Sequence, residues 1–295
     1  MLSAFNGTGR NVKVSRKVSV AIPASVVSDT PHLREKTAKI GLIGRAVAIF
    51  RIHEIIVYQD MPKANQTSDT ELIATLLSYM ETPQYLRKRL FKIKPELQFA
   101  GILPPLRTAH HPLNRQSKNL KLGEYREGVT VSQTKVGVLV DVGVEQPALV
   151  LNKQLSMNKR VTVRITGIDK QIQAEIADRE EIQDYWGYIV DAERQTLGKL
   201  LRSRKYDLII GTSKYGVSFG DMAEKIREKW KAASTVLVAF GSPTQGLHEI
   251  IKREGLNLDE IMDYVVNLIP AQGTETVRTE EALIASLAIL NSLTA

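Results

Sequence analysis

The stretch TVLVAFGSPTQGLHEIIKREGLNLDEIMDYVVNLIPAQGT, residues 235–274, decides the fold. It contains two apolar, strand-like runs, TVLVAFG and YVVNLIP, and between them a helix-like segment at 247–254. The alternation extends back through YIVDAE, DLIIGTS and helices expected at 196–204 and 221–231, and forward to a helix at 279–293. Alternating strands and helices indicate a parallel sheet with helices on both faces, an α/β fold.

The N-terminal part of the chain predicts one further β-α-β unit. Strands are expected at 18–22 and 54–58, and a helix between them begins near Asp29-Thr30-Pro31 and runs to Phe50. A second helix is expected from Asp69 to about Leu90. Because this unit is too small to bury a core alone, we expect it to join the C-terminal sheet.

The middle of the chain differs in character. Prolines and the pair His110-His111 predict a linker at 101–111, without the acidic or thiolate ligands that would make the pair a metal site. Five short strands follow between Leu120 and Ile176, which favours a small closed barrel of the OB type. The predicted domains are therefore a discontinuous α/β domain, 1–100 and 181–295, and an inserted barrel, 101–180.

Composition excludes several function classes. The absence of cysteine excludes disulfides, thiolate metal sites and a cysteine nucleophile. A net charge of +8 favours a polyanionic partner such as RNA. No apolar stretch approaches the roughly 20 residues of a membrane span, and the N-terminus lacks the apolar core of a signal peptide. We expect a soluble, cytoplasmic protein with no membrane partner and no metal.

Three expected strands of the C-terminal half are followed by glycine-containing loops, at 211–216, 240–246 and 270–274. Ligands of open α/β sheets bind beyond the carboxyl ends of the strands, where glycine lets the backbone approach closely. Val217 and Leu247 stand where a P-loop would need lysine, so a nucleotide-hydrolysing enzyme is disfavoured. Each loop alone is also typical of an ordinary turn.

Three segments carry a resemblance to a known family: AIPASVVSDTPHLREKTAKIGLIGRAVAIF (21–50), VAFGSPTQGLHEI (238–250) and VNLIPAQGTETVRTEEALIASLAIL (266–290). Together they resemble the archaeal and eukaryotic branch of the SPOUT superfamily that carries an inserted OB-like domain. The resemblance implies a deep C-terminal trefoil knot, S-adenosylmethionine as cofactor, methylation of RNA, and a homodimer. The expected interface combines the apolar helix at 279–293 with the helix at 29–50.

The resemblance also implies site residues. Backbone groups of Leu268, Ile269 and Gly273 are expected to contact adenine, and Gly241 is expected to leave space for the ribose. Thr276, Thr279 and Glu280 are better explained as shaping the last helix, with Thr279 as its N-cap. Arg278 and Tyr215 are the catalytic candidates, and no residue is assigned as the base. The full cofactor-binding set is Gly241, Asn267, Leu268, Ile269, Gln272, Gly273, Thr274 and Val277.

Basic residues suggest where RNA would bind. Arg34 and Arg45 lie on the first helix, and the barrel carries several cations but Tyr125 as its only aromatic residue. Such a barrel would hold RNA mainly through the phosphates. A barrel that docks protein remains the alternative. The barrel candidates are Lys121, Arg126, Lys135, Lys159 and Arg160, with Lys118, Lys153 and Arg164 as further cations.

Two functions follow from these observations. The first is an S-adenosylmethionine-dependent methyltransferase that acts on a base of structured, possibly ribosomal, RNA, with uracil N3 as an acceptor implied only by the resemblance. The second is a non-catalytic RNA-binding or ribosome-assembly protein that keeps the knot for dimerisation. Cofactor binding distinguishes the two.

Overall fold

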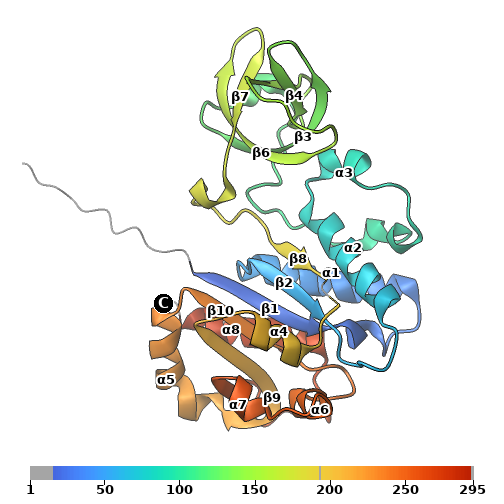
Figure 1. The fold of residues 1–295 in the computed structure, drawn as a ribbon, viewed down its shortest axis with the longest axis vertical. Coiled ribbons are helices and arrows are strands. Elements are labelled where there is room, and N and C mark those ends of the chain that lie inside the picture. The colour runs from blue at the N-terminus through green and yellow to red at the C-terminus, as the bar shows by residue number, and fades with distance from the viewer. Residues whose placement is uncertain (1–15, 193, 294–295) are drawn as a thin grey trace, which may run out of the picture.

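The computed structural model describes residues 16–192 and 194–293. A parallel sheet with the strand order β11-β9-β10-β1-β2-β8 forms the centre of the larger part of the molecule (Figure 1). β1 pairs with β10 on one side and with β2 on the other, so the N-terminal unit joins the C-terminal sheet as predicted. The strands are β1 (Lys17–Pro23), β2 (Glu54–Tyr58), β8 (Ile189–Asp191), β9 (Leu208–Ser218), β10 (Thr235–Ala239) and β11 (Tyr264–Asn267).

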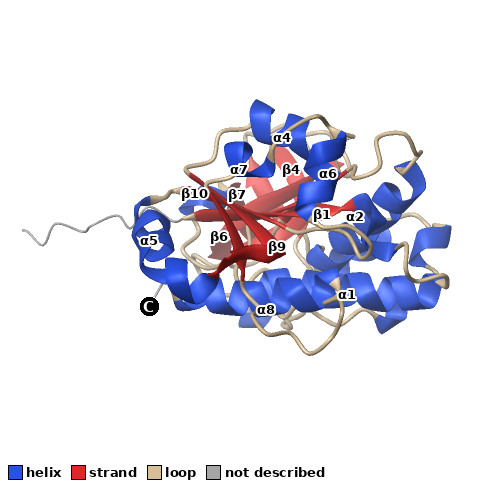
Figure 2. Cartoon of the chain, turned by 90° about the horizontal axis from the view of Figure 1, so that it is seen from below, coloured by secondary structure: helices blue, strands red, loops and turns tan. Residues whose placement is uncertain are grey.

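Helices cover both faces of the sheet (Figure 2). Because parallel strands are buried on both sides, their side chains feed two apolar clusters, one under each helix layer. One layer holds α1 (Leu33–Ile49), α2 (Thr67–Glu81), α5 (Phe219–Ala232) and α8 (Thr279–Ser292). The other holds α4 (Leu197–Ser203), α6 (Leu247–Arg253) and α7 (Leu258–Ile261).

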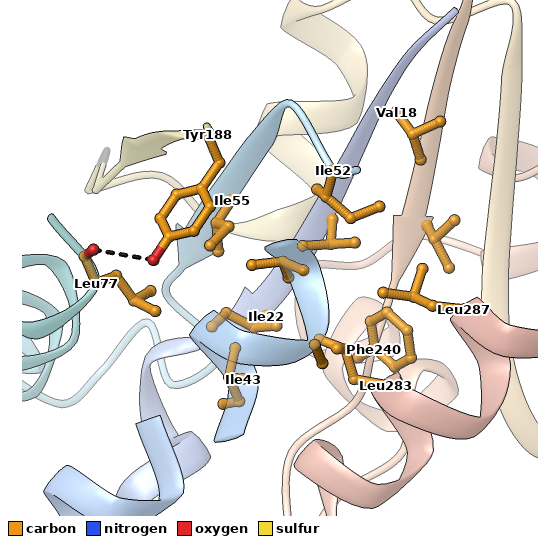
Figure 3. Close-up of a cluster of buried hydrophobic side chains, with 14 of the residues drawn as sticks. Val18, Ile22, Ile43, Ile52, Ile55, Leu77, Tyr188, Phe240, Leu283 and Leu287 are labelled. Carbon is orange, nitrogen blue, oxygen red and sulfur yellow. Dashed lines mark hydrogen bonds between the residues drawn. The ribbon is translucent and has the colours of Figure 1, made fainter. Parts of the chain in front are cut away.

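The larger cluster joins segments that are far apart in sequence (Figure 3). Ile43 of α1 and Leu287 of α8 both belong to it, as does Phe240, which follows β10. Tyr188 is 2% exposed and donates a hydrogen bond from its hydroxyl to the Leu77 carbonyl at 3.0 Å. This bond satisfies the phenol inside an apolar environment and attaches the chain before β8 to α2.

Two expected helix boundaries are wrong. The helix predicted at 69–90 is broken into α2 and α3 (Gln84–Leu90), because Pro83 cannot continue a helix and Thr82 before it is extended. The first helix begins at Leu33 rather than at Asp29, because His32 is still extended.

The middle of the chain forms a closed barrel with the strand order β3-β4-β5-β7-β6. This confirms the five predicted strands and their closure. The barrel lies at one end of the molecule, beyond α3 and β8, with its own apolar cluster (Figure 1). Its strands are β3 (Tyr125–Gln133), β4 (Gly137–Asp141), β5 (Ala148–Leu151), β6 (Arg160–Ile168) and β7 (Ile172–Ile176).

A buried ionic network joins the barrel to the sheet. Glu127 of β3 is completely buried and accepts hydrogen bonds from Arg160, Arg179, Thr162 and the Trp186 indole. Arg160 also donates to both carboxylate oxygens of Glu81 at the end of α2. We call this set of six residues the joint. Burial would raise the pKa of Glu127, but the guanidinium charges of Arg160 and Arg179 lower it to about 2.

Burial and internal hydrogen bonds correct two RNA-binding candidates. Arg126 is 0% exposed, and its guanidinium donates to Glu124 and to the carbonyls of Asn114 and Val142. Arg160 is held between two carboxylates. Both side chains are therefore committed to the fold and cannot serve as the phosphate contacts expected of them.

The linker segment that contains His110 and His111 is held against the end of α2. His110 is 0% exposed, and both imidazoles place Nε2 at the Glu81 carbonyl, at 2.9 and 2.7 Å. Burial lowers the pKa of His110 to about 4, and burial together with the neighbouring imidazole lowers the pKa of His111 to about 4. These residues pack beside the joint as neutral groups.

We therefore expect the protein to lose stability in acid at pH values well above the pKa of Glu127. Each histidine has a folded-state pKa near 4, below its ordinary value of 6.5, so the unfolded chain binds more protons. Stability is complete above pH 6.5 and is lost as the pH falls toward 4, by about 2 kcal/mol per histidine at pH 4.5. Urea unfolding at pH 7.5 and 4.5 measures this loss.

The matched variants are His110→Gln with His111→Gln, and the exposed control His32→Gln. The double variant is expected to be less stable at pH 7.5 but to lose much less between the two pH values. A wild-type protein equally stable at both values, or an unchanged pH dependence in the double variant, contradicts this prediction.

Candidate functional site

A pocket opens at the carboxyl ends of three adjacent strands, β9, β10 and β11. Seven of the residues predicted to form the site line it: Tyr215, Gly241, Asn267, Leu268, Ile269, Gln272 and Val277. Gly273, Thr274 and Arg278 lie in the loop between β11 and α8 but are not among the lining residues. The other lining residues, nine of which lie in the glycine-containing loops at 211–216 and 240–246, are Thr212, Ser213, Lys214, Phe240, Ser242, Pro243, Thr244, Gln245, Gly246, Glu249, Thr276, Thr279, Ala282 and Ser286.

The first wall of the pocket is a bulge in β9. Gly211 pairs with Val265 of β11, but the next β11 residue, Val266, pairs with Val217. The residues between, 212–216, therefore leave the ladder, and we call them the β9 bulge. The sequence predicted a loop after the strand here, whereas the strand resumes and ends at Ser218. Bulges redirect side chains in this way beside ligand sites.

Asn267 ties the bulge to the second wall of the pocket. Its side-chain amide donates to the Lys214 carbonyl at 3.1 Å, and its oxygen accepts from the Ile269 N–H at 3.0 Å. The N–H of Ile269 is thus used within the chain, which corrects the expectation that it contacts adenine. On the same loop, the Gln272 amide donates to the carbonyls of Thr274 and Glu275.

The third wall is the turn that follows β10. Ser242 donates its N–H to the Gln245 carbonyl at 2.9 Å, and a Cβ on Gly241 would lie 2.9 Å from that same carbonyl oxygen. Glycine is therefore required by the tight turn itself, rather than only by space for a ribose. The hydroxyl of Tyr58 donates to the Phe240 carbonyl at 2.7 Å and fixes the start of the turn.

Consecutive residues at the start of α8 contact the turn after β10, each other and α1. Thr279 donates its hydroxyl to the Gly241 carbonyl at 3.1 Å, and the Glu281 carboxylate accepts from the Arg278 N–H at 2.9 Å. The N-cap is Arg278, so the expected cap at Thr279 is wrong by one residue. Buried Glu280 lies 3.4 Å from the Lys39 ammonium of α1.

The chain shows a family relationship over nearly its whole length. A family described as "Putative RNA methyltransferase" matches residues 17–290. The chain belongs to this family. Residues 17–290 include every strand of both the sheet and the barrel, so the match covers the two parts together.

Individual relatives support the same family. The chain is 32% identical to an uncharacterized protein of Halobacterium salinarum, with 92% of this chain and 98% of the relative covered. It is 31% identical to a 28S rRNA (uridine-N(3))-methyltransferase of Drosophila melanogaster and 33% identical to one of Mus musculus, again over 92% of this chain. It spans 61% of the fly protein and 75% of the mouse protein.

Few charged side chains of this RNA methyltransferase family member line the pocket. Lys214 and Glu249 are the lining residues that carry charge. Tyr215 is 78% exposed at the pocket edge. Within residues 16–192 and 194–293, no group of three or more potential metal ligands is found. The pocket therefore offers hydroxyls, backbone groups and one charge of each sign.

The predicted RNA contacts lie in different environments. Arg34, Lys121, Lys135 and Lys159 are exposed. Arg45, in contrast, donates to the carbonyls of Pro105 and Leu106 and holds the segment after η3 (Ala100–Ile102) against α1. Of the two α1 arginines, Arg34 is thus the one whose charge faces solvent.

Among the described helices, none is long and apolar enough to cross a membrane.

Proposed function

We propose that this protein is an S-adenosylmethionine-dependent methyltransferase that modifies uracil N3 in a structured, ribosomal RNA. The observation that carries the proposal is the pocket at the carboxyl ends of β9, β10 and β11, whose lining residues all lie within the range that the family matches. The relatives named as 28S rRNA (uridine-N(3))-methyltransferases supply the acceptor atom.

The residues present fit the cofactor. Ile269 and Val277 are partly exposed and offer apolar surface for an adenine ring, and the hydroxyls of the lining serine and threonine residues suit a ribose. Lys214 and Glu249 can pair with the carboxylate and the ammonium of the methionine end. Thus the polar, apolar and charged parts of the cofactor each have a counterpart.

Bound S-adenosylmethionine supplies an electrophilic methyl group on a sulfonium centre. The chain must then hold the acceptor in line with that methyl group and exclude water. The β9 bulge and the turn after β10 are both fixed by internal hydrogen bonds, so the walls are preorganised. Arg278 and Tyr215 stay the proposed catalytic side chains, Arg278 for a phosphate or a uracil carbonyl.

The remaining features of the SPOUT family belong to the same proposal. We propose a trefoil knot in the C-terminal part, an inserted RNA-binding barrel at 101–180, and a homodimer through α1 and α8. Leu42 and Ile49 of α1 and Ile284 of α8 are apolar but 51%, 56% and 41% exposed, which supports an interface there. Exposed Lys121, Lys135 and Lys159 support phosphate contacts by the barrel.

Two measurements test the proposal. Calorimetry with S-adenosylmethionine should give a saturable heat, and mapping of methylated nucleotides after incubation with total RNA should show a new modified uridine. Absence of heat at millimolar cofactor would overturn cofactor binding and leave the non-catalytic RNA-binding alternative. Cofactor binding with methylation at another base would overturn only the assignment of uracil N3.

A further inference from the structure

Tyr215 combines two properties that seldom occur together. It lines the pocket, yet its side chain is 78% exposed, the largest exposed aromatic surface beside the site. Within the described part of the chain its phenol takes part in no hydrogen bond, and the Lys214 ammonium lies 5.1 Å from its ring centroid. The ring therefore contributes little to the fold for an aromatic group of its size.

The backbone beneath this ring is firmly held. The Tyr215 N–H donates to the Ser213 hydroxyl at 3.2 Å, and the preceding carbonyl accepts from Asn267. A Cβ on Gly216 would lie 2.7 Å from the Val265 carbonyl oxygen, so the bulge returns to β11 by a close backbone contact. An exposed ring on a fixed backbone can bind a planar ligand at a small cost in conformational entropy.

We propose that Tyr215 is the stacking platform for the nucleobase that is extruded from the RNA and methylated. This inference rests on the proposed function. A base must leave its helix to reach a pocket at the strand ends, and flipped or single-stranded bases are held by stacking on aromatic side chains. Tyr215 is then a positioning residue and no longer one of the two catalytic side chains proposed above, because its ring is used and its hydroxyl is not.

Substitutions separate stacking from proton transfer. Tyr215→Ala should raise the KM for RNA on the order of 10-fold, the effect of losing one stacked base. Tyr215→Phe should restore most of this loss, whereas Tyr215→Leu should not. Val217→Ala, a change at a 53% exposed residue of the same strand outside the pocket lining, is the control and should leave the KM unchanged. The Kd of S-adenosylmethionine is measured for each variant.

Two results overturn the inference. If Tyr215→Phe is as impaired as Tyr215→Ala, the hydroxyl acts in catalysis. If Tyr215→Ala weakens cofactor binding and leaves the KM for RNA unchanged, the ring belongs to the cofactor site.

A further experiment does not depend on methyl transfer. The indole fluorescence of Tyr215→Trp, taken as the difference from wild type, should be quenched by single-stranded oligouridylate. If the wild-type protein is inactive and the indole of Tyr215→Trp is nevertheless quenched, the proposed function is contradicted and stacking is supported. Absence of quenching at saturating oligouridylate overturns the stacking platform, whatever the activity.

Discussion

Replacing Gly241 by valine is expected to weaken the binding of S-adenosylmethionine on the order of 100-fold and to remove most methyl transfer. The first atom of the new side chain would lie 2.9 Å from the Gln245 carbonyl oxygen and 3.3 Å from the Gly246 Cα. These are backbone atoms of the turn that forms one wall of the pocket, so they cannot rotate away. The turn must open, and it carries Ser242 and Gln245 with it.

The matched control is Gly220→Val in α5. There a Cβ would meet only the Ser218 hydroxyl oxygen, at 3.7 Å, which is ordinary van der Waals contact. Both variants add the same side chain, and calorimetry with the cofactor compares them directly. Equal cofactor affinity of Gly241→Val and wild type would show that the turn is not part of the binding site.

Replacing Glu127 by alanine is expected to lower the free energy of unfolding by about 3 to 5 kcal/mol. The carboxylate is 1% exposed in its side chain and lies against two guanidinium groups, those of Arg160 and Arg179. Its removal leaves both cations without that anion and leaves the Trp186 indole N–H without its acceptor. The change affects the barrel and the sheet together, because the joint contains residues of both.

Trp186 offers a local probe of this change. The chain has two tryptophans, and the second, Trp230, lies in α5 within the larger apolar cluster. Urea unfolding followed by fluorescence in a Trp230→Phe background therefore reports on the joint. The control is Glu175→Gln, which removes the exposed pair between Arg164 and Glu175 and should cost less than about 1 kcal/mol. A similarly small loss for Glu127→Ala would contradict the structural role of the joint.

The local pattern of apolar residues predicts the strands of the parallel sheet and of the barrel. The parallel strands are continuous apolar runs, and the barrel strands are short and separated by polar turns, so the sequence alone distinguished the two parts. The break at Pro83 was also visible in the sequence, as a proline within an apparent helical pattern. At this position the missing backbone donor of proline outweighs the apolar periodicity.

Properties that depend on partners distant in sequence could not be predicted. The β9 bulge exists because β11 pairs with Gly211 and Val217 and passes over the residues between. The burial of Arg126 depends on Asn114 and Val142, which approach it only when the barrel closes. A positive charge in the sequence indicates attraction to RNA but does not show whether it faces solvent. The family resemblance named seven of the residues that line the pocket, while the hydrogen bonds of the pocket required the fold.

The joint has a consequence for how a substrate would be selected. A barrel attached through one flexible peptide could reach RNA at many distances from the pocket, whereas Glu127, Arg160 and Glu81 fix it in one orientation. Under the proposed function, the distance between the RNA surface bound by the barrel and the base at the pocket is then fixed. A transcript in which a few base pairs are inserted between those two points should be a poor substrate, even though its target uridine and its neighbours are unchanged.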